Sequence, residues 1–459
     1  MPNATDFICA VYDELAKLLN MTDANPSIVM QMAWPGFSLS AQDFKPAGNP
    51  SGPYDPQVAK ETFSYLANIA PELSKPFFQN SGLEVDDLYE ILLTGAIPGA
   101  STPDTIGSNP MYKLFGDAQY EFLQAKTGSS VDPNVFYYPC LATPANWYDE
   151  AAAPSWPTFS MQSGDTKPAA PSAQFVKAGG LALLNQGLWK LRPTSAASAH
   201  TVKRMAQQSV TQQQQGLAAK AVMPAKERIQ ATSVRSAAAV SAMPAAAQVR
   251  AVAPANAALL RAPAPVANAV AAEIQNLFIQ KKIPASSYSK YKLDKQIQAL
   301  DLTQRKLDLG PVGVANRYAL TSLINHALPA KPAGSSDGFS ISFRYCRVNI
   351  ERSWFKLALL KMKGWYMFGT QAGEYSTGSG NNNPGMFPLL PTSFIAIRDL
   401  RITANWSQQD RQNLDQATAL GFFDIREATL NANTLEVKGL QVLGWISSLT
   451  PQLPPMSAP

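Results

Sequence analysis

Histidine and cysteine most often carry catalysis or bind metals, and this sequence contains few of them. Its 459 residues include two histidines, His200 and His326, and three cysteines, Cys9, Cys140 and Cys346. The cysteines lie far apart, none belongs to a CxxC pair, and an odd number cannot form a closed disulfide framework. We therefore expect three reduced, mostly buried thiols and no zinc-type site.

Motifs that announce catalysis are also absent, because the sequence contains no GxSxG, HExxH or GxxxxGK[ST] pattern. Acidic side chains are densest at Glu84, Asp86, Asp87 and Glu90, at helical spacings that could hold calcium or magnesium. The same residues lie at a predicted helix N-terminus, where the helix dipole favours anions without a metal. We expect no catalytic residue, metal or cofactor, although a carboxylate-based glycosidase stays open.

A long Gly- and Asn-rich stretch, residues 369–391, is the best candidate for a binding loop. Such loops between strands are uncommon unless they bind a ligand or form a contact, and their backbone amides can hold an anion or a sugar. The candidate binding residues are Trp365, Tyr366, Gly378, Gly380, Asn381, Asn382 and Asn383. A contact loop within an assembly is the alternative, and the aromatic pair would also suit a core.

Residues 193–265 form a segment rich in Ala, Pro and Gln, which we interpret as a linker. Its prolines interrupt helices, and its few large apolar side chains can bury little surface. Between His200 and Pro265 it carries eight basic residues and one acid, Glu227. Contacts with anionic lipid or nucleic acid are therefore expected at the basic residues, chiefly at Lys203, Arg204, Lys220, Lys226, Arg228 and Arg235. A purely solubilising linker is the other interpretation.

Residues 1–192 predict a mainly helical, loop-rich module. Apolar residues at helical spacing indicate helices near residues 5–19, 56–70, 83–94 and 111–125. Asp55 followed by Pro56 is a favoured helix start, since the carboxylate accepts an orphan N–H and proline preorganises the first turn. The aromatic, proline-rich sequence beyond residue 135 predicts loops pinned to these helices.

Residues 266–459 predict helices followed by an antiparallel β-sandwich-like module, so the fold class is α+β. The apolar residues alternate from Phe339 onward, but their parity switches in three places, near residues 346, 399 and 439. Because a strand keeps its face only at period two, each switch indicates a bulge or a change of environment. Inserted helices are expected at 354–363, capped by Ser353, and from Ser407 toward Gly421.

Membrane insertion and export by a signal peptide are both unexpected. Residues 1–20 carry three acids and no basic n-region, and no run of about 20 apolar residues occurs. We therefore expect a cytoplasmic protein, or one released by a route that needs no signal.

The formal net charge is +5, and only 15% of the residues are charged against 46% that are hydrophobic. A low charge leaves little self-repulsion between packed copies. We therefore expect a non-enzymatic structural or interaction protein that acts as a homo-oligomer. One alternative is a membrane-acting toxin component of the pore-forming or insecticidal type, which would use the basic linker on anionic lipid. Another is a shell protein that packages nucleic acid.

Overall fold

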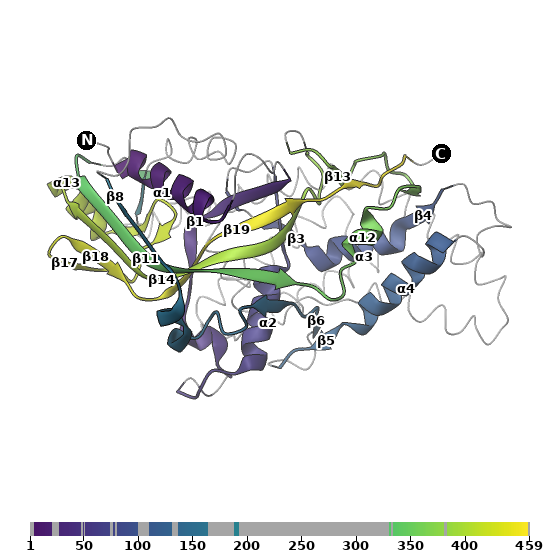
Figure 1. Ribbon diagram of the computed structural model, residues 1–459, viewed down its shortest axis with the longest axis horizontal. Coiled ribbons are helices and arrows are strands. Elements are labelled where there is room, and N and C mark those ends of the chain that lie inside the picture. Colours follow the sequence, from purple (N-terminus) through teal and green to yellow (C-terminus); the bar gives the residue numbers. More distant parts are fainter. Residues whose placement is uncertain are drawn as a thin grey trace, which may run out of the picture.

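The computed structural model describes residues 4–20, 27–46, 49, 51–73, 77–78, 80–99, 110–130, 136–163, 188–191, 330–331, 334–380 and 383–457. Within these residues the chain combines helices with a large antiparallel sheet, which confirms the predicted mixed α+β class (Figure 1). In the same ranges, no helix has both the length and the apolar character needed to span a membrane.

In the described part of the chain, eight strands form one large sheet that extends along the molecule (Figure 1). Its central path is β1-β19-β14-β11-β7, while β8 pairs with β11 and β18 joins β14 to β17. The strands are β1 (Ile28–Leu39), β7 (Leu141–Thr143), β8 (Thr158–Gln162), β11 (Asp337–Glu351), β14 (Leu389–Asn405), β17 (Thr429–Asn431), β18 (Thr434–Val437) and β19 (Leu440–Leu449).

Three of these strands, β1, β7 and β8, come from residues 1–192, so helices and loops alone are an incomplete description of that segment. The strand β1 was not predicted, because Pro35 and Gly36 interrupt the strand pattern in its sequence. The register of β1 against β19 shifts between Met32 and Phe37, which leaves the proline outside the regular ladder, where it needs no N–H donor. The division at residues 192 and 265 stays a prediction, and 193–265 lies outside the described residues.

Smaller sheets complete the β structure of the described residues. A four-stranded sheet has the order β10-β9-β15-β16, with β9 (Trp189–Leu191), β10 (Ala330–Lys331), β15 (Ala417–Leu420) and β16 (Phe423–Asp424). The two-stranded pairs are β2 (Ile69–Pro71) with β3 (Asn80–Glu84), β4 (Ala96–Pro98) with β12 (Trp365–Met367), β5 (Thr127–Gly128) with β6 (Phe136–Tyr137), and β13 (Ser376–Thr377) with β20 (Gln452–Leu453).

The helices of the first segment confirm the predicted apolar spacings. They are α1 (Ala4–Leu18), α2 (Pro56–Ala67), α3 (Val85–Gly95) and α4 (Pro110–Gln124), with short 3-10 turns η1 (Ala41–Phe44) and η3 (Glu150–Ser155). The predicted cap of α2 is also confirmed, since the Asp55 carboxylate accepts hydrogen bonds from the backbone N–H groups of Gln57 (2.7 Å) and Val58 (3.4 Å).

Both helices inserted between the later strands are shorter than predicted. α12 (Leu357–Leu360) is a single turn that follows Lys356, not a helix capped by Ser353. Trp354 is instead buried, and its Nε1–H donates to the Pro139 carbonyl at 2.9 Å, which holds this part of the chain outside a helix. Ser407 does cap α13 (Gln408–Leu414), but this helix ends before residue 417. Residues 417–420 form the strand β15 instead, and all four are buried there.

Two hydrophobic cores lie among these elements and use opposite faces of the large sheet. The first core packs α2, α3 and α4 against sheet residues such as Phe394 and Trp445. The second core packs α1 and the four-stranded sheet against neighbouring residues of the opposite parity, such as Ile395 and Ile446. The centre of the large sheet is therefore buried on both sides, as runs of consecutive apolar residues require.

At two of the predicted parity switches, in β11 and between β18 and β19, the apolar side chains change from one hydrophobic core to the other. In β11, Ile341 and Phe343 face the second core whereas Cys346 and Val348 face the first, and the pairing with β14 shifts register between Ser342 and Arg344. In β14 the switch occurs at Asp399, which has a φ of 54°. The third switch is not a bulge, because there one strand, β18, ends and another, β19, begins.

The Asp55 cap gives a direct test of the α2 assignment. We expect Asp55→Ala to lower the free energy of unfolding by about 1 kcal/mol, because two backbone donors lose their acceptor. Urea denaturation measures this loss. Asp55→Asn keeps a side-chain oxygen and is the matched control. Equal losses in the two variants would contradict a capping role.

Candidate functional site

The aromatic pair predicted for binding lies in β12, which pairs with β4. Trp365 is completely buried, and its ring meets Phe115 of α4 edge-on with centroids 5.6 Å apart. Tyr366 is half-buried on the opposite side of the strand. Trp365 therefore contributes to the first core, which is the third of the roles considered for this pair.

The predicted Gly/Asn loop is held together by its own polar groups. Asn383 is 6% exposed, its Oδ1 accepts from the Thr377 N–H at 2.9 Å, and its Nδ2 donates to Ser376 Oγ at 3.0 Å. The Gly378 N–H also donates to Ser376 Oγ, at 3.1 Å. Gly380 is exposed, whereas Asn381 and Asn382 lie outside the described residues. The structure thus brings Gly378 and Asn383 together around Ser376, and ligand binding by the loop stays a prediction.

Of two further sets of predicted groups, the structure describes only the cysteines. The basic residues Lys203, Arg204, Lys220, Lys226, Arg228 and Arg235 all lie outside the described residues. The three cysteines are free and buried, as expected, and burial raises the pKa of Cys9 and Cys140 to about 12 and that of Cys346 to about 11. Among the residues that the structure describes, no group of three or more His, Cys, Asp and Glu side chains could hold a metal ion.

Three charged residues of the described structure each gather several hydrogen bonds, and the first is Asp410 of α13. This carboxylate is 1% exposed and accepts from Trp189 Nε1 (2.9 Å) and the Gly334 N–H (2.9 Å) through Oδ1. Its Oδ2 accepts from the hydroxyls of Ser336 and Ser407. Four neutral donors therefore solvate the carboxylate and join β9, the chain before β11, and α13.

The second cluster surrounds Arg352, just beyond the end of β11. Its guanidinium donates to the carbonyls of Pro391 (2.7 Å) and Ala67, and to Asn68 Oδ1 (3.4 Å). Ala67 is the last residue of α2, so the cation takes up a carbonyl that the helix leaves without an internal partner. Arg352 thereby fixes the end of α2 to β14.

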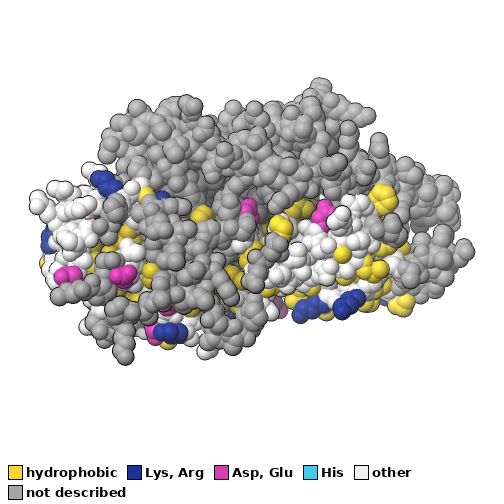
Figure 2. All heavy atoms as spheres, turned by 90° about the horizontal axis from the view of Figure 1, so that it is seen from above, with side chains coloured by type: hydrophobic (Ala, Val, Ile, Leu, Met, Phe, Trp, Pro, Cys, Tyr) yellow, Lys and Arg dark blue, Asp and Glu magenta, His cyan; other side chains and the backbone are white. Residues whose placement is uncertain are grey.

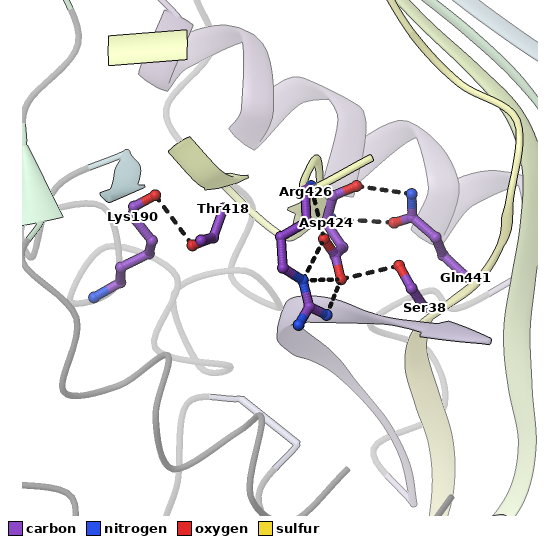
Figure 3. Close-up of polar contacts among 6 residues, drawn as sticks. All are labelled: Ser38, Lys190, Thr418, Asp424, Arg426 and Gln441. Atoms are coloured by element: carbon purple, nitrogen blue, oxygen red, sulfur yellow. Dashed lines mark hydrogen bonds and ion pairs between the residues drawn. The ribbon is translucent and has the colours of Figure 1, made fainter. Parts of the chain in front are cut away.

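The third cluster lies on the four-stranded sheet (Figure 3). Asp424 is 1% exposed and accepts from Ser38 Oγ at 2.9 Å and from the Arg426 guanidinium. Gln441 closes the cluster, because its Oε1 accepts from the Asp424 N–H at 3.1 Å and its Nε2 donates to the Asp424 carbonyl at 2.9 Å. These bonds fasten β16 to β1 and β19.

Lys190 lies in the same row of paired residues across the four-stranded sheet as Asp424, but its side chain forms no hydrogen bond or ion pair with the Asp424 carboxylate. The register pairs Lys190 with Ala419, and Ala419 with Asp424, so the three lie in line across the sheet. Lys190 is 2% exposed, and burial lowers the pKa of its ammonium group. In the described ranges no hydrogen bond or ion pair joins this ammonium to another side chain, and Thr418 Oγ1 contacts only the Lys190 carbonyl, at 3.1 Å (Figure 3).

At one end of the large sheet, the described residues pack against one face only. We use "the open end" for β8, β17, β18, residues 337–344 of β11 and residues 399–405 of β14, at the left in Figure 1. One face contributes Phe159, Ile341, Ile402 and Leu435, among others, to the second core. The opposite face carries polar side chains that are exposed or half-buried, including Ser160, Ser342, Arg401, Thr403, Thr434 and Glu436.

Polar pairs across the strands order this outer face. Thr403 Oγ1 lies 2.8 Å from Thr434 Oγ1, and Arg401 Nε lies 3.5 Å from Glu436 Oε1. The face continues onto β8, where Thr158, Ser160 and Gln162 are exposed and Phe159 and Met161 are buried. The open end is therefore an ordered, polar β-surface that ends in an edge strand, and we take it as the candidate interaction site.

The loops predicted beyond residue 135 include residues 158–162, and there the prediction is wrong because these residues form β8. The alternation Thr-Phe-Ser-Met-Gln is the period-two signal that could have identified it. The burial of Lys190 has no comparable signal in the sequence, because the residues that bury it are distant along the chain.

Comparison with known proteins gives no independent indication of function: protein-family models, curated proteins and solved structures were searched, and none matched this chain.

The Asp424 cluster predicts an asymmetric response to mutation. We expect Arg426→Met to cost about 3 kcal/mol of unfolding free energy, because it leaves a carboxylate buried without its cation. Adding Asp424→Asn should recover part of this loss, since a neutral amide is easier to bury. Urea denaturation of both single variants and the double variant measures the coupling, and strictly additive costs would contradict the ion pair.

Lys190 predicts a pH-dependent effect. Because burial lowers its pKa, the folded state disfavours the protonated amine, and this penalty shrinks as pH rises toward the ordinary lysine value of 10.5. Lys190→Met should therefore stabilise the protein at pH 7, by about 1 kcal/mol, and less as the pH approaches 10. Lys331→Met, at an exposed neighbour, is the control. A gain independent of pH would contradict a desolvated amine.

Proposed function

We propose that this protein is a non-enzymatic structural or interaction protein that works as an oligomeric assembly through contacts of its β-sheet and loops. The observation that carries the proposal is the open end, where the sheet finishes in an edge strand with exposed, uncharged side chains. Unprotected strand edges are the places where β-rich chains pair with one another, because their backbone donors and acceptors are available.

The use of the buried charges supports the same proposal. Asp410, Asp424 and Arg352 each direct several hydrogen bonds to neighbouring segments. Groups occupied in this way stabilise the fold and contribute to the rigidity that a building block needs.

The end opposite the open end adds a second kind of surface. Exposed apolar side chains lie on α4 and the elements beside it, at Leu114, Tyr120, Leu123, Phe136 and Phe368. Figure 2 shows apolar side chains at the surface of this end of the molecule, at the right. Apolar groups gathered at a surface are typical of proteins that form contacts.

The β-sandwich predicted for the C-terminal part is included in the proposal. The large sheet and the four-stranded sheet both contribute to the second core, through residues such as Ile402 and Phe423. Two sheets that share one core are the arrangement of a sandwich, which is a frequent architecture for self-associating modules.

The native mass of the full-length chain tests the proposal. We expect size-exclusion chromatography with light scattering to give an oligomer of defined stoichiometry, and negative-stain images to show a particle of one size. Because the open edge is uncharged, the assembly should persist at about 1 M salt, where charge interactions are screened beyond about 3 Å. A strict monomer at the highest soluble concentration would contradict the proposal.

A further inference from the structure

The backbone of β8 alternates between bonding to β11 and pointing away from it. The register pairs Phe159 with Phe343 and Met161 with Ile341, and the Ser163 N–H donates to the Phe339 carbonyl at 2.7 Å. In an antiparallel pair, hydrogen-bonded and non-hydrogen-bonded residues alternate. Since residue 163 is hydrogen-bonded, residues 161 and 159 are too, and the backbone groups of Thr158, Ser160 and Gln162 point outward.

In the part of the chain that the structure describes, this outer edge lacks the charges and prolines that commonly protect an edge strand. The five residues of β8 include no charged residue and no proline. In the described structure, the outward N–H and C=O groups at 158, 160 and 162 have no hydrogen-bond partner. Their side chains are also exposed, so the outer face does not hinder approach to the edge.

At the opposite side of the sheet, the edge strand β1 has hydrogen-bond partners outside the sheet. In β1 the Met30 carbonyl accepts from the Tyr12 hydroxyl at 3.1 Å, and the Met32 carbonyl accepts from the Phe78 N–H at 2.9 Å. The Gly36 N–H donates to the Phe422 carbonyl at 2.7 Å. Within the described ranges, the edge of β1 is therefore covered and the outer edge of β8 is not.

We propose that β8 pairs antiparallel with β8 of a second copy of this chain, about a two-fold axis that passes between the two Ser160 residues. This inference rests on the proposed oligomeric function and names its contact. Thr158 of each copy pairs with Gln162 of the other, and Ser160 pairs with itself. The two large sheets then form one continuous sheet across the axis.

The strand is complementary to itself in this register. Its three outward-facing residues are placed symmetrically about Ser160, so all three pairs are of the hydrogen-bonded type and exchange about six N–H···O bonds. On the outer face the opposed side chains are Ser with Ser and Thr with Gln, which are neutral and small enough to pack. On the inner face Phe159 of each copy lies opposite Met161 of the other, which continues the second core across the axis.

This symmetry favours a second copy over an unrelated strand. A foreign strand would be selected by charges or by pockets that alternate along the edge, and β8 offers three neutral polar side chains. A symmetric dimer also closes on itself, so the pairing occupies the β8 edge of both copies and does not propagate through it into fibres.

Charge reversal at the axis is the sharpest test. Ser160→Lys and Ser160→Asp each place two like charges opposite one another, and each should weaken self-association at least about tenfold. An equimolar mixture of the two variants should associate again as a heterodimer, as native mass spectrometry can show. Ser342→Lys places the same charge on the same face one strand inward and is the matched control, which should associate like the native chain.

Cysteine pairs test the register without charge. Ser160→Cys should form a disulfide-linked dimer under mild oxidation, because paired residues lie about 5.5 Å apart between Cα atoms. Thr158→Cys alone should not cross-link, since its copies are four residues apart along the strands, about 13 Å. The double variant Thr158→Cys/Gln162→Cys should cross-link. The native cysteines are buried, so they do not compete.

The possible outcomes separate the inference from the proposed function. If the native chain is oligomeric, yet the Ser160 variants associate normally and no register-specific cross-link forms, the β8 contact is wrong and the oligomeric function stands. A monomeric native chain contradicts both. Cross-linking of all single cysteine variants alike would indicate random collision and would also overturn the β8 pairing. Ser160→Pro removes only an outward N–H, and it replaces the charged variants in this test if they fail to fold.

Discussion

The burial of β14 on both faces is the constraint on which the rest of this structure depends. From Leu389 to Arg398 almost every side chain of the strand is excluded from water, with alternate residues in different cores. Both faces must therefore be covered, by α2, α3 and α4 on one side and by α1 with the four-stranded sheet on the other. The neighbouring strands supply apolar groups to the same two cores. The apolar residues of β11 and of β18–β19 therefore also change parity near the switch in β14.

Polar groups inside the molecule follow from that arrangement. Covering both faces of the sheet brings segments from distant parts of the chain into the interior, and their ends carry backbone groups that need partners. Arg352 at the end of α2, and Asp410 between β9 and α13, satisfy several such groups at once. Lys190 differs from these two groups, because burial lowers its pKa and, in the described ranges, no side chain pairs with its ammonium.

The same construction explains why the open end is open. Where β14 passes Asp399, the first core ends, and the sheet continues with only the second core beneath it. The outer face there is polar, and its strands end laterally at β8. Among the described residues no segment pairs with the outer edge of β8, whereas the edge of β1 is closed by Tyr12, Phe78 and Phe422. The surface that we assign to assembly is thus a consequence of where the cores stop.

Local patterns were enough to predict the helices of the first segment, the Asp55 and Ser407 caps, the three parity switches and the burial of the cysteines. Each of these depends on neighbouring residues only, through helical spacing, a capping oxygen or alternation along a strand. For the loop predicted to bind a ligand such patterns leave the role open, because Gly378 and Asn383 also form hydrogen bonds within the loop, and ligand binding stays a prediction.

Pairing between distant segments was decided by tertiary structure alone. The sequence of β1 contains a proline and a glycine and becomes a strand only because β19 offers it a partner with a compatible register. The stretch 417–420 would suit a helix, but it lies against β9 and fills the second core. Lys190 and Asp424 come into line through hydrogen bonds between strands more than 200 residues apart, which composition and spacing along the chain do not encode.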